Sequence, residues 1–314
     1  MHPAYSVILF TTASGAGYGL LALLGIVGFN HGPSSSLWFG AVAIIIALGL
    51  ITLGLLSSTF HLGRPERAWR AFSQWRSSWL SREGIASVIT FAPALLFGAL
   101  WLGFIAKPQW IGLAGLATAA MCAVTVFCTA KIYSTLTTIR QWHHKLTVPV
   151  YLAFALATGA VLLMAIASVF GLYQIFQAGL AVVALILTLV LKFLYWRQID
   201  AEPRNRTIEA ATGLARAGET VRQWEVPHTA KNFIMNEMGY AVARKHAEKL
   251  RRLVMILLLL AILVTVLTMA APGLAIPLSI IAFLLAGAAA AVERWLFFAE
   301  AQHVVSLFYG AERA

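Results

Sequence analysis

Charged residues are scarce in this chain. Asp, Glu, Lys and Arg make up 11% of its 314 residues, against 60% hydrophobic residues, and the mean hydropathy is +0.82. A soluble protein of this composition would expose large apolar patches to water. The composition therefore excludes a soluble globular domain and predicts a polytopic membrane protein, whose length is divided into bilayer spans of roughly 20 residues.

Cysteine is almost absent, which restricts the redox chemistry that the chain can perform alone. Cys122 and Cys128 lie in an apolar run without a CxxC motif, so we expect small apolar fillers rather than a redox pair, and no iron–sulfur cluster. None of the eight histidines lies deep in an apolar run, so no pair could ligate a membrane haem on both faces. We expect neither haem nor metal on this chain.

Two further absences concern transport and targeting. The apolar runs contain no chain of Asp or Lys residues, and no internal repeat stands out, which disfavours an ion-driven transporter. The N-terminus lacks a basic segment and a convincing cleavage site, so we expect the first apolar run to be retained.

Long apolar runs dominate what the sequence does contain. Each can cross a bilayer as a helix, because a helix satisfies its own backbone hydrogen bonds in lipid. The predicted fold class is all-α, a single integral membrane domain over residues 1–314 with eight transmembrane helices. The runs are Tyr5–Phe29, Leu37–Phe60, Gly84–Ala106, Trp110–Ala130, Pro149–Phe170, Tyr173–Tyr195, Leu253–Ala271 and Ala275–Phe298.

Positive charge is distributed unequally between the two sides of these spans. Eight spans place both termini on one side, and of the 23 Lys and Arg residues only Lys107 falls in a connection on the other side. The positive-inside rule then places both termini in the cytoplasm, together with the long connection at residues 196–252. Within that connection, Glu237–Arg252 has helical spacing and a basic face, so we expect it to lie along the membrane surface. It is either a solvated linker attracted to anionic lipid or a docking surface for another subunit.

A basic segment that carries a histidine and a glutamate separates the second and third runs. Gly63 and Pro65 break the helix after His61, so we expect its imidazole at the membrane surface, where it can exchange a proton or hydrogen-bond a carbonyl. Glu83 begins the third run and could conduct protons to a ligand near His61. The structural alternatives are an interfacial or capping histidine and a carboxylate that complements the helix dipole.

Other polar residues near the span ends have mainly structural interpretations. Glu293 and Arg294 lie inside the last run and are expected to pair with groups on neighbouring helices. Adjacent His143 and His144 are weak support for a metal site. Arginines alternate with aromatic residues after His61, which indicates an interfacial segment in contact with membrane lipid rather than a nucleic-acid surface. The members of this alternation are Arg64, Arg67, Trp69, Arg70, Phe72, Trp75, Arg76, Trp79 and Arg82.

Three segments carry a resemblance to a known family. They are His61–Trp69 (HLGRPERAW), Leu80–Glu83 (LSRE) and Val292–Phe298 (VERWLFF). Together with the eight spans, they resemble the membrane anchor subunit of dimethyl sulfoxide reductase-type enzymes along nearly the whole chain. The long connection, with 210–214, 227–229 and 237–246, resembles a narrower branch that includes the anchors of cytoplasmic membrane-bound sulfite dehydrogenases.

The resemblance implies a three-subunit complex in the bacterial inner membrane. A molybdopterin catalytic subunit and a four-cluster iron–sulfur subunit would dock on the cytoplasmic side, and the anchor would exchange electrons with ubiquinone or menaquinone. By motif, His61 matches the family's quinone-site histidine, Glu83 its acidic residue and Arg67 its arginine. Arg64 stands where some members have a small polar residue, and we expect it at the quinone as well.

Electron transfer to quinone during sulfite oxidation is the function that the resemblance favours. One alternative is a quinol-oxidising anchor of a dimethyl sulfoxide reductase-type complex. Another is a purely structural anchor without a quinone site.

Overall fold

The fold is a bundle of long helices. The computed structural model describes residues 4–31, 36–60, 62–202, 206–214, 219–222, 224–225 and 242–309, and in these ranges it contains no strand. Eight helices are long and apolar enough to cross a membrane, so the predicted all-α polytopic fold is confirmed. They are α1 (Tyr5–His31), α2 (Leu37–Thr59), α3 (Trp79–Trp101), α4 (Ile111–Ser134), α5 (Thr147–Val169), α6 (Ile175–Ala201), α9 (Val242–Ala270) and α10 (Ala275–Ala299).

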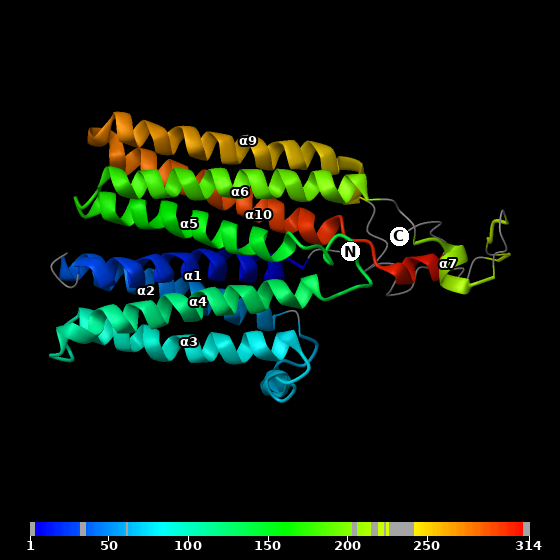
Figure 1. Cartoon of the computed structure of the whole chain (residues 1–314), viewed down its shortest axis with the longest axis horizontal. Coiled ribbons are helices and arrows are strands. Elements are labelled where there is room, and N and C mark those ends of the chain that lie inside the picture. Colours follow the sequence, from blue (N-terminus) through cyan, green and yellow to red (C-terminus); the bar gives the residue numbers. More distant parts are fainter. Residues whose placement is uncertain are drawn as a thin grey trace.

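The eight helices form two groups of four. Helices α1 to α4 pack together as one group, and α5, α6, α9 and α10 as the other, which Figure 1 shows as blue-to-cyan and green-to-red layers. The groups meet because α1 packs against α5 and α10, and α4 packs against α5. Residues at the centre of the bundle therefore come from both halves of the chain.

Helices α1 and α5 approach each other at a pair of glycines. A Cβ atom added to Gly19 would lie 1.9 Å from the Ala155 carbonyl oxygen, and one added to Gly159 would lie 2.3 Å from the Gly19 carbonyl carbon. Small residues permit such close backbone packing between membrane helices, where apolar side chains gain nothing by leaving lipid. This crossing joins the two halves of the bundle.

The smaller elements gather at one end of the bundle. The start of α1 lies at the same end as the 3-10 helix η2 (Pro65–Phe72), the short helix α7 (Ile208–Thr212) and the 3-10 helix η5 (Val304–Tyr309) (Figure 1). We call this the polar end, because most of the Lys and Arg residues that the structure describes belong to these elements or to the neighbouring helix ends. The other end carries short connections, including the 3-10 helices η3 (Pro108–Trp110) and η4 (Pro272–Leu274).

Two helix starts differ from the sequence prediction. Helix α3 begins at Trp79, five residues before Gly84, since the Ser78 hydroxyl caps its first turn by accepting from the Ser81 N–H at 3.5 Å. The residues 242–252 do not form a separate surface helix: they are the first turns of α9, which continues without a break into the seventh span. Residues 242–252 thus extend the spanning helix α9, whereas residues 237–241 of the predicted surface segment lie outside the described ranges.

Cys122 and Cys128 are buried and free, as predicted.

Candidate functional site

The segment between α2 and α3 begins at a helix end. Helix α2 stops at Thr59, and the Leu62 N–H donates to the Thr59 carbonyl oxygen at 3.1 Å, so the predicted break before Pro65 is confirmed. His61 lies outside the described residues, and its predicted role stays a prediction.

The 3-10 helix η2 lies against the start of α3. The Ser81 hydroxyl donates to the Ala71 carbonyl oxygen. The Phe72 ring covers Gly84 so closely that a Cβ there would lie 3.3 Å from its Cε1 atom. A hydrogen bond and an aromatic contact therefore hold η2 over the turn of α3 that contains Glu83.

Glu83 is a buried carboxylate inside α3. It lies four residues past the start of the helix, so the expectation that it begins the span is wrong by one turn, because Ser78 starts the helix earlier. The Ser87 hydroxyl lies 3.2 Å from Glu83 Oε1 and 2.8 Å from the backbone carbonyl oxygen of Glu83. Thr129 of α4 lies beside the Glu83 carboxyl group. A carboxylate in this position needs hydrogen-bond donors to offset its lost hydration. It is well placed to hold or release a proton.

In the part of the chain that the structure describes, Arg64 and Arg67 form no ion pair with Glu83. Arg64 is exposed and forms no ion pair in the described part of the chain. Arg67 is half exposed, and its Nε atom lies 4.0 Å from neighbouring Glu66. Such a contact at the surface contributes little to stability. Both guanidinium groups are therefore accessible to a partner or ligand.

Other arginines of this segment contact tryptophan rings. The guanidinium carbon of Arg82 lies 4.4 Å from the centroid of Trp79, and that of Arg76 lies 5.3 Å from the centroid of Trp75. Arg82 also donates from Nε to the Trp75 carbonyl oxygen at 2.9 Å. Trp75 is exposed and Trp79 is half-buried, and tryptophans beside arginines are typical of a membrane interface.

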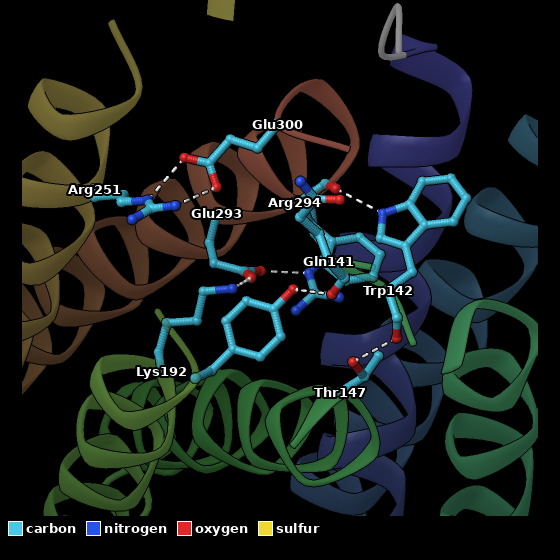
Figure 2. A network of polar contacts seen from close by, with 10 residues as sticks. Gln141, Trp142, Thr147, Lys192, Arg251, Glu293, Arg294 and Glu300 are labelled. Atoms are coloured by element: carbon cyan, nitrogen blue, oxygen red, sulfur yellow. Dashed lines mark hydrogen bonds and ion pairs between the residues drawn. The ribbon is translucent and has the colours of Figure 1, made fainter. Parts of the chain in front are cut away.

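A second polar cluster is buried between α6 and α10. Glu293 Oε1 lies 2.5 Å from Lys192 Nζ, and Glu293 Oε2 lies 2.5 Å from Arg294 Nε (Figure 2). All three side chains are at most 3% exposed. The predicted pairing of Glu293 across helices is confirmed, whereas Arg294 pairs with its own neighbour in the chain. The Arg294 guanidinium also stacks 3.7 Å from the centroid of the Tyr151 ring.

Lys192 is the residue of this cluster that sequence reasoning missed. It falls within the predicted run Tyr173–Tyr195, and the structure places it inside α6, which continues to Ala201. A usable signal was present, because apolar residues flank Lys192 on both sides, from Val190 to Leu194. A lone lysine within an apolar run requires a buried partner.

Ion pairs continue from this cluster toward the surface. Arg251 of α9 lies 2.8 Å from Glu300 Oε1 and 2.7 Å from Asp200 Oδ2 (Figure 2 shows the bonds to Glu300). The Glu300 side chain is 12% exposed and that of Asp200 is 59% exposed. Charged groups therefore extend from the interior of the second half to the polar end.

The two adjacent histidines have structural partners. The His143 ring nitrogen Nδ1 lies 2.7 Å from the Ser134 carbonyl oxygen. His144 Nδ1 accepts from the Leu146 N–H at 3.1 Å, which makes Nδ1 unprotonated. Burial lowers the pKa of His144, so its ring is neutral at pH 7 despite Glu202 at 4.0 Å. The two histidine rings thus bind backbone groups of the α4 end and of the connection between α4 and α5.

Comparison with known proteins places the chain in one family. The DMSO reductase anchor subunit (DmsC) family matches residues 1–311. A sulfite dehydrogenase subunit of Allochromatium vinosum is 34% identical over 98% of this chain and 99% of that protein. A component of the anaerobic dimethyl sulfoxide reductase of Haemophilus influenzae is 26% identical over 45% of this chain and 50% of that protein. With the eight membrane-spanning helices, these matches show that the chain belongs to the DMSO reductase anchor subunit family.

Proposed function

We propose that this membrane anchor passes electrons from an iron–sulfur subunit to membrane quinone during sulfite oxidation. Anchor subunits of this family assemble with catalytic and iron–sulfur subunits. The choice of sulfite rests on the similarity to a sulfite dehydrogenase subunit, which extends along almost the whole of both chains. The proposed partners are a molybdopterin catalytic subunit and a four-cluster iron–sulfur subunit.

The buried carboxylate of Glu83 is the observation that carries the quinone proposal. Quinone reduction consumes two electrons and two protons, and the protons must be delivered where the ring carbonyls bind. Glu83 can supply one, because its carboxyl is buried next to the hydroxyls of Ser87 and Thr129. His61 would hydrogen-bond one carbonyl. The exposed guanidinium groups of Arg64 and Arg67 would contact the quinone or the docked subunit.

The proposed sidedness follows from the polar end of the bundle. The start of α1, η2 and η5 lie at this end (Figure 1), and Lys107 is the N-cap residue of η3 at the other. We propose that the polar end faces the cytoplasm of a bacterium, across the inner membrane, and that the partner subunits dock on η2 and its surroundings. An orientation assay that places residue 314 outside the cell would contradict this arrangement.

Two substitutions test the quinone site. In the purified complex, His61→Ala and Glu83→Gln should each lower sulfite-dependent quinone reduction by about 100-fold, the usual loss when a positioned acid or base is removed. Sulfite oxidation with a soluble electron acceptor should be unchanged, since that reaction bypasses the anchor. Glu248→Gln is the control, because its carboxylate is exposed on α9, outside the segment between α2 and α3.

The outcomes separate the alternatives. Undiminished quinone reduction in both variants would refute the assignment of the site. Separately, a purified complex of the unaltered protein that binds no quinone analogue would show that the protein is a structural anchor. Quinol oxidation coupled to reduction of dimethyl sulfoxide, without sulfite oxidation, would show that electrons flow from quinol to the catalytic subunit, opposite to the proposed direction.

A further inference from the structure

A polar cavity lies where the two halves of the bundle meet. It is lined by residues of α1, α4, α5 and α10, among them Tyr18, Thr129, Tyr151 and Arg294, and its volume available to water is about 30 Å³. Since about 10–15 Å³ of such volume suffices for one water molecule, the cavity accommodates about two. Thr11 and Thr12 on its rim are half-buried.

Several polar atoms at this cavity have unused hydrogen-bonding capacity. Among the described residues, Tyr18 Oη, Tyr151 Oη and both terminal nitrogens of Arg294 are buried without a well-formed hydrogen bond, although Ser87 lies next to Tyr18 and the Arg294 guanidinium lies next to Tyr151. Burying such a group unpaired costs about 1–3 kcal/mol, and more when it is charged. Three buried side chains that share one polar cavity are therefore best satisfied by ordered water within it.

The cavity connects the two polar clusters of the molecule. On one side, Thr129 lines the cavity and lies beside the Glu83 carboxyl, and Tyr18 lies next to Ser87. On the other side, Arg294 lines the cavity and binds Glu293, which binds Lys192. The cavity and its lining residues from four helices thus lie between a buried carboxylate in each half of the bundle.

We propose that the cavity holds ordered water and forms a proton route from the Lys192–Glu293 pair to Glu83. The route supplies the proton that Glu83 delivers, and in this respect it rests on the proposed quinone reaction. Arg294 stays protonated and orients the water as a donor, because arginine does not release a proton in proteins. Water and the hydroxyls of Tyr18, Tyr151 and Thr129 carry the proton.

The first test asks whether the cavity is hydrated. Purified complex in ¹⁸O-labelled water is exposed to a short radiolytic pulse, which generates hydroxyl radicals from water bound in place. Tyr18 and Tyr151 should incorporate ¹⁸O although they are buried. Tyr195 is the internal control, because it is buried and its hydroxyl donates to the Gln141 carbonyl oxygen at 2.6 Å. Labelling of Tyr18 and Tyr151 no higher than that of Tyr195 would overturn the proposal without any variant.

The second test asks whether the hydroxyls carry protons. Tyr18→Phe and Tyr151→Phe should each lower quinone reduction on the order of tenfold, with an increased solvent isotope effect and unchanged binding of a quinone analogue. Infrared spectra should show slower hydrogen–deuterium exchange at the Glu83 carboxyl. Tyr173→Phe is the matched control, since its hydroxyl bonds Thr268 outside the cavity lining.

The results distinguish this route from the quinone site itself. Loss of quinone reduction in Glu83→Gln, with both tyrosine variants normal in rate and exchange, would refute the route and leave the proposed function intact. Normal quinone reduction in Glu83→Gln, with slowed carboxyl exchange in the tyrosine variants, would refute the role of Glu83 and support the route. If the phenylalanine variants do not fold, the ¹⁸O labelling of the unaltered protein decides.

Discussion

Replacing Glu293 by glutamine should lower the free energy of unfolding by about 3–5 kcal/mol, the usual cost of removing one partner from a buried ion pair. Lys192 and Arg294 each lie 2.5 Å from this carboxylate, and both are buried. Glutamine keeps the shape of the side chain but leaves two cations close together without a counter-charge. Thermal unfolding of the detergent-purified protein, followed by tryptophan fluorescence, measures the loss.

Two further variants show whether the loss comes from charge. Glu248→Gln removes a carboxylate from an exposed pair with Arg252 and should change stability by less than about 0.5 kcal/mol. In a Lys192→Met background, Glu293→Gln should lower the free energy of unfolding by less than it does alone, because only one of the two cations then lacks a counter-charge. Equal stability of Glu293→Gln and the unaltered protein would show that the cluster does not support the fold.

The Gly19→Leu substitution should disrupt the junction between the two halves of the bundle. The new Cβ would lie 1.9 Å from the Ala155 carbonyl oxygen, which is backbone and cannot rotate away. Overpacking of a core costs about 1–3 kcal/mol and more when backbone must shift, so we expect a loss of about 3 kcal/mol or more. Size-exclusion chromatography should show little folded monodisperse protein.

Position 49 offers a matched control for this substitution. Gly49 of α2 has no heavy atom within 4 Å of an added Cβ. Gly49→Leu adds the same side chain in the same bilayer and should leave the yield of folded protein unchanged. A well-folded Gly19→Leu variant would mean that α1 and α5 separate without penalty.

The fold class was predictable because the apolar runs are long. All eight spans follow from the length of the apolar runs, because a helix is the simplest structure that pairs all backbone N–H and C=O groups within lipid. Helix ends were less predictable. Trp79 to Glu83 contains polar residues that read as a surface segment, yet capping by Ser78 draws them into α3. Likewise the basic residues before Leu253 read as a surface helix, although they extend α9.

The candidate site was predictable only in part. Glu83 was found by motif, and its burial follows from contacts with α4 that no local pattern records. Glu293 was recognised as a residue that needs a partner, whereas its partner Lys192 lies about a hundred residues earlier in the chain. Tyr18 and Tyr151 belong to ordinary apolar runs, and their shared cavity arises from the packing of α1 on α5. Such pairings depend on three-dimensional packing rather than on periodicity.

The central position of α1 has a consequence for biogenesis. This helix is made first, has the lowest mean hydropathy of the eight spans at 1.7, and contacts α2, α4, α5 and α10. Its later partners do not exist until most of the chain has left the ribosome. Between these events, the Tyr18 hydroxyl would face lipid tails unless the insertion machinery shelters it. Folding of the subunit is therefore sequential. Helix α1 is inserted before α5 and α10, and the second half of the bundle can pack against α1 only after these helices have been synthesised.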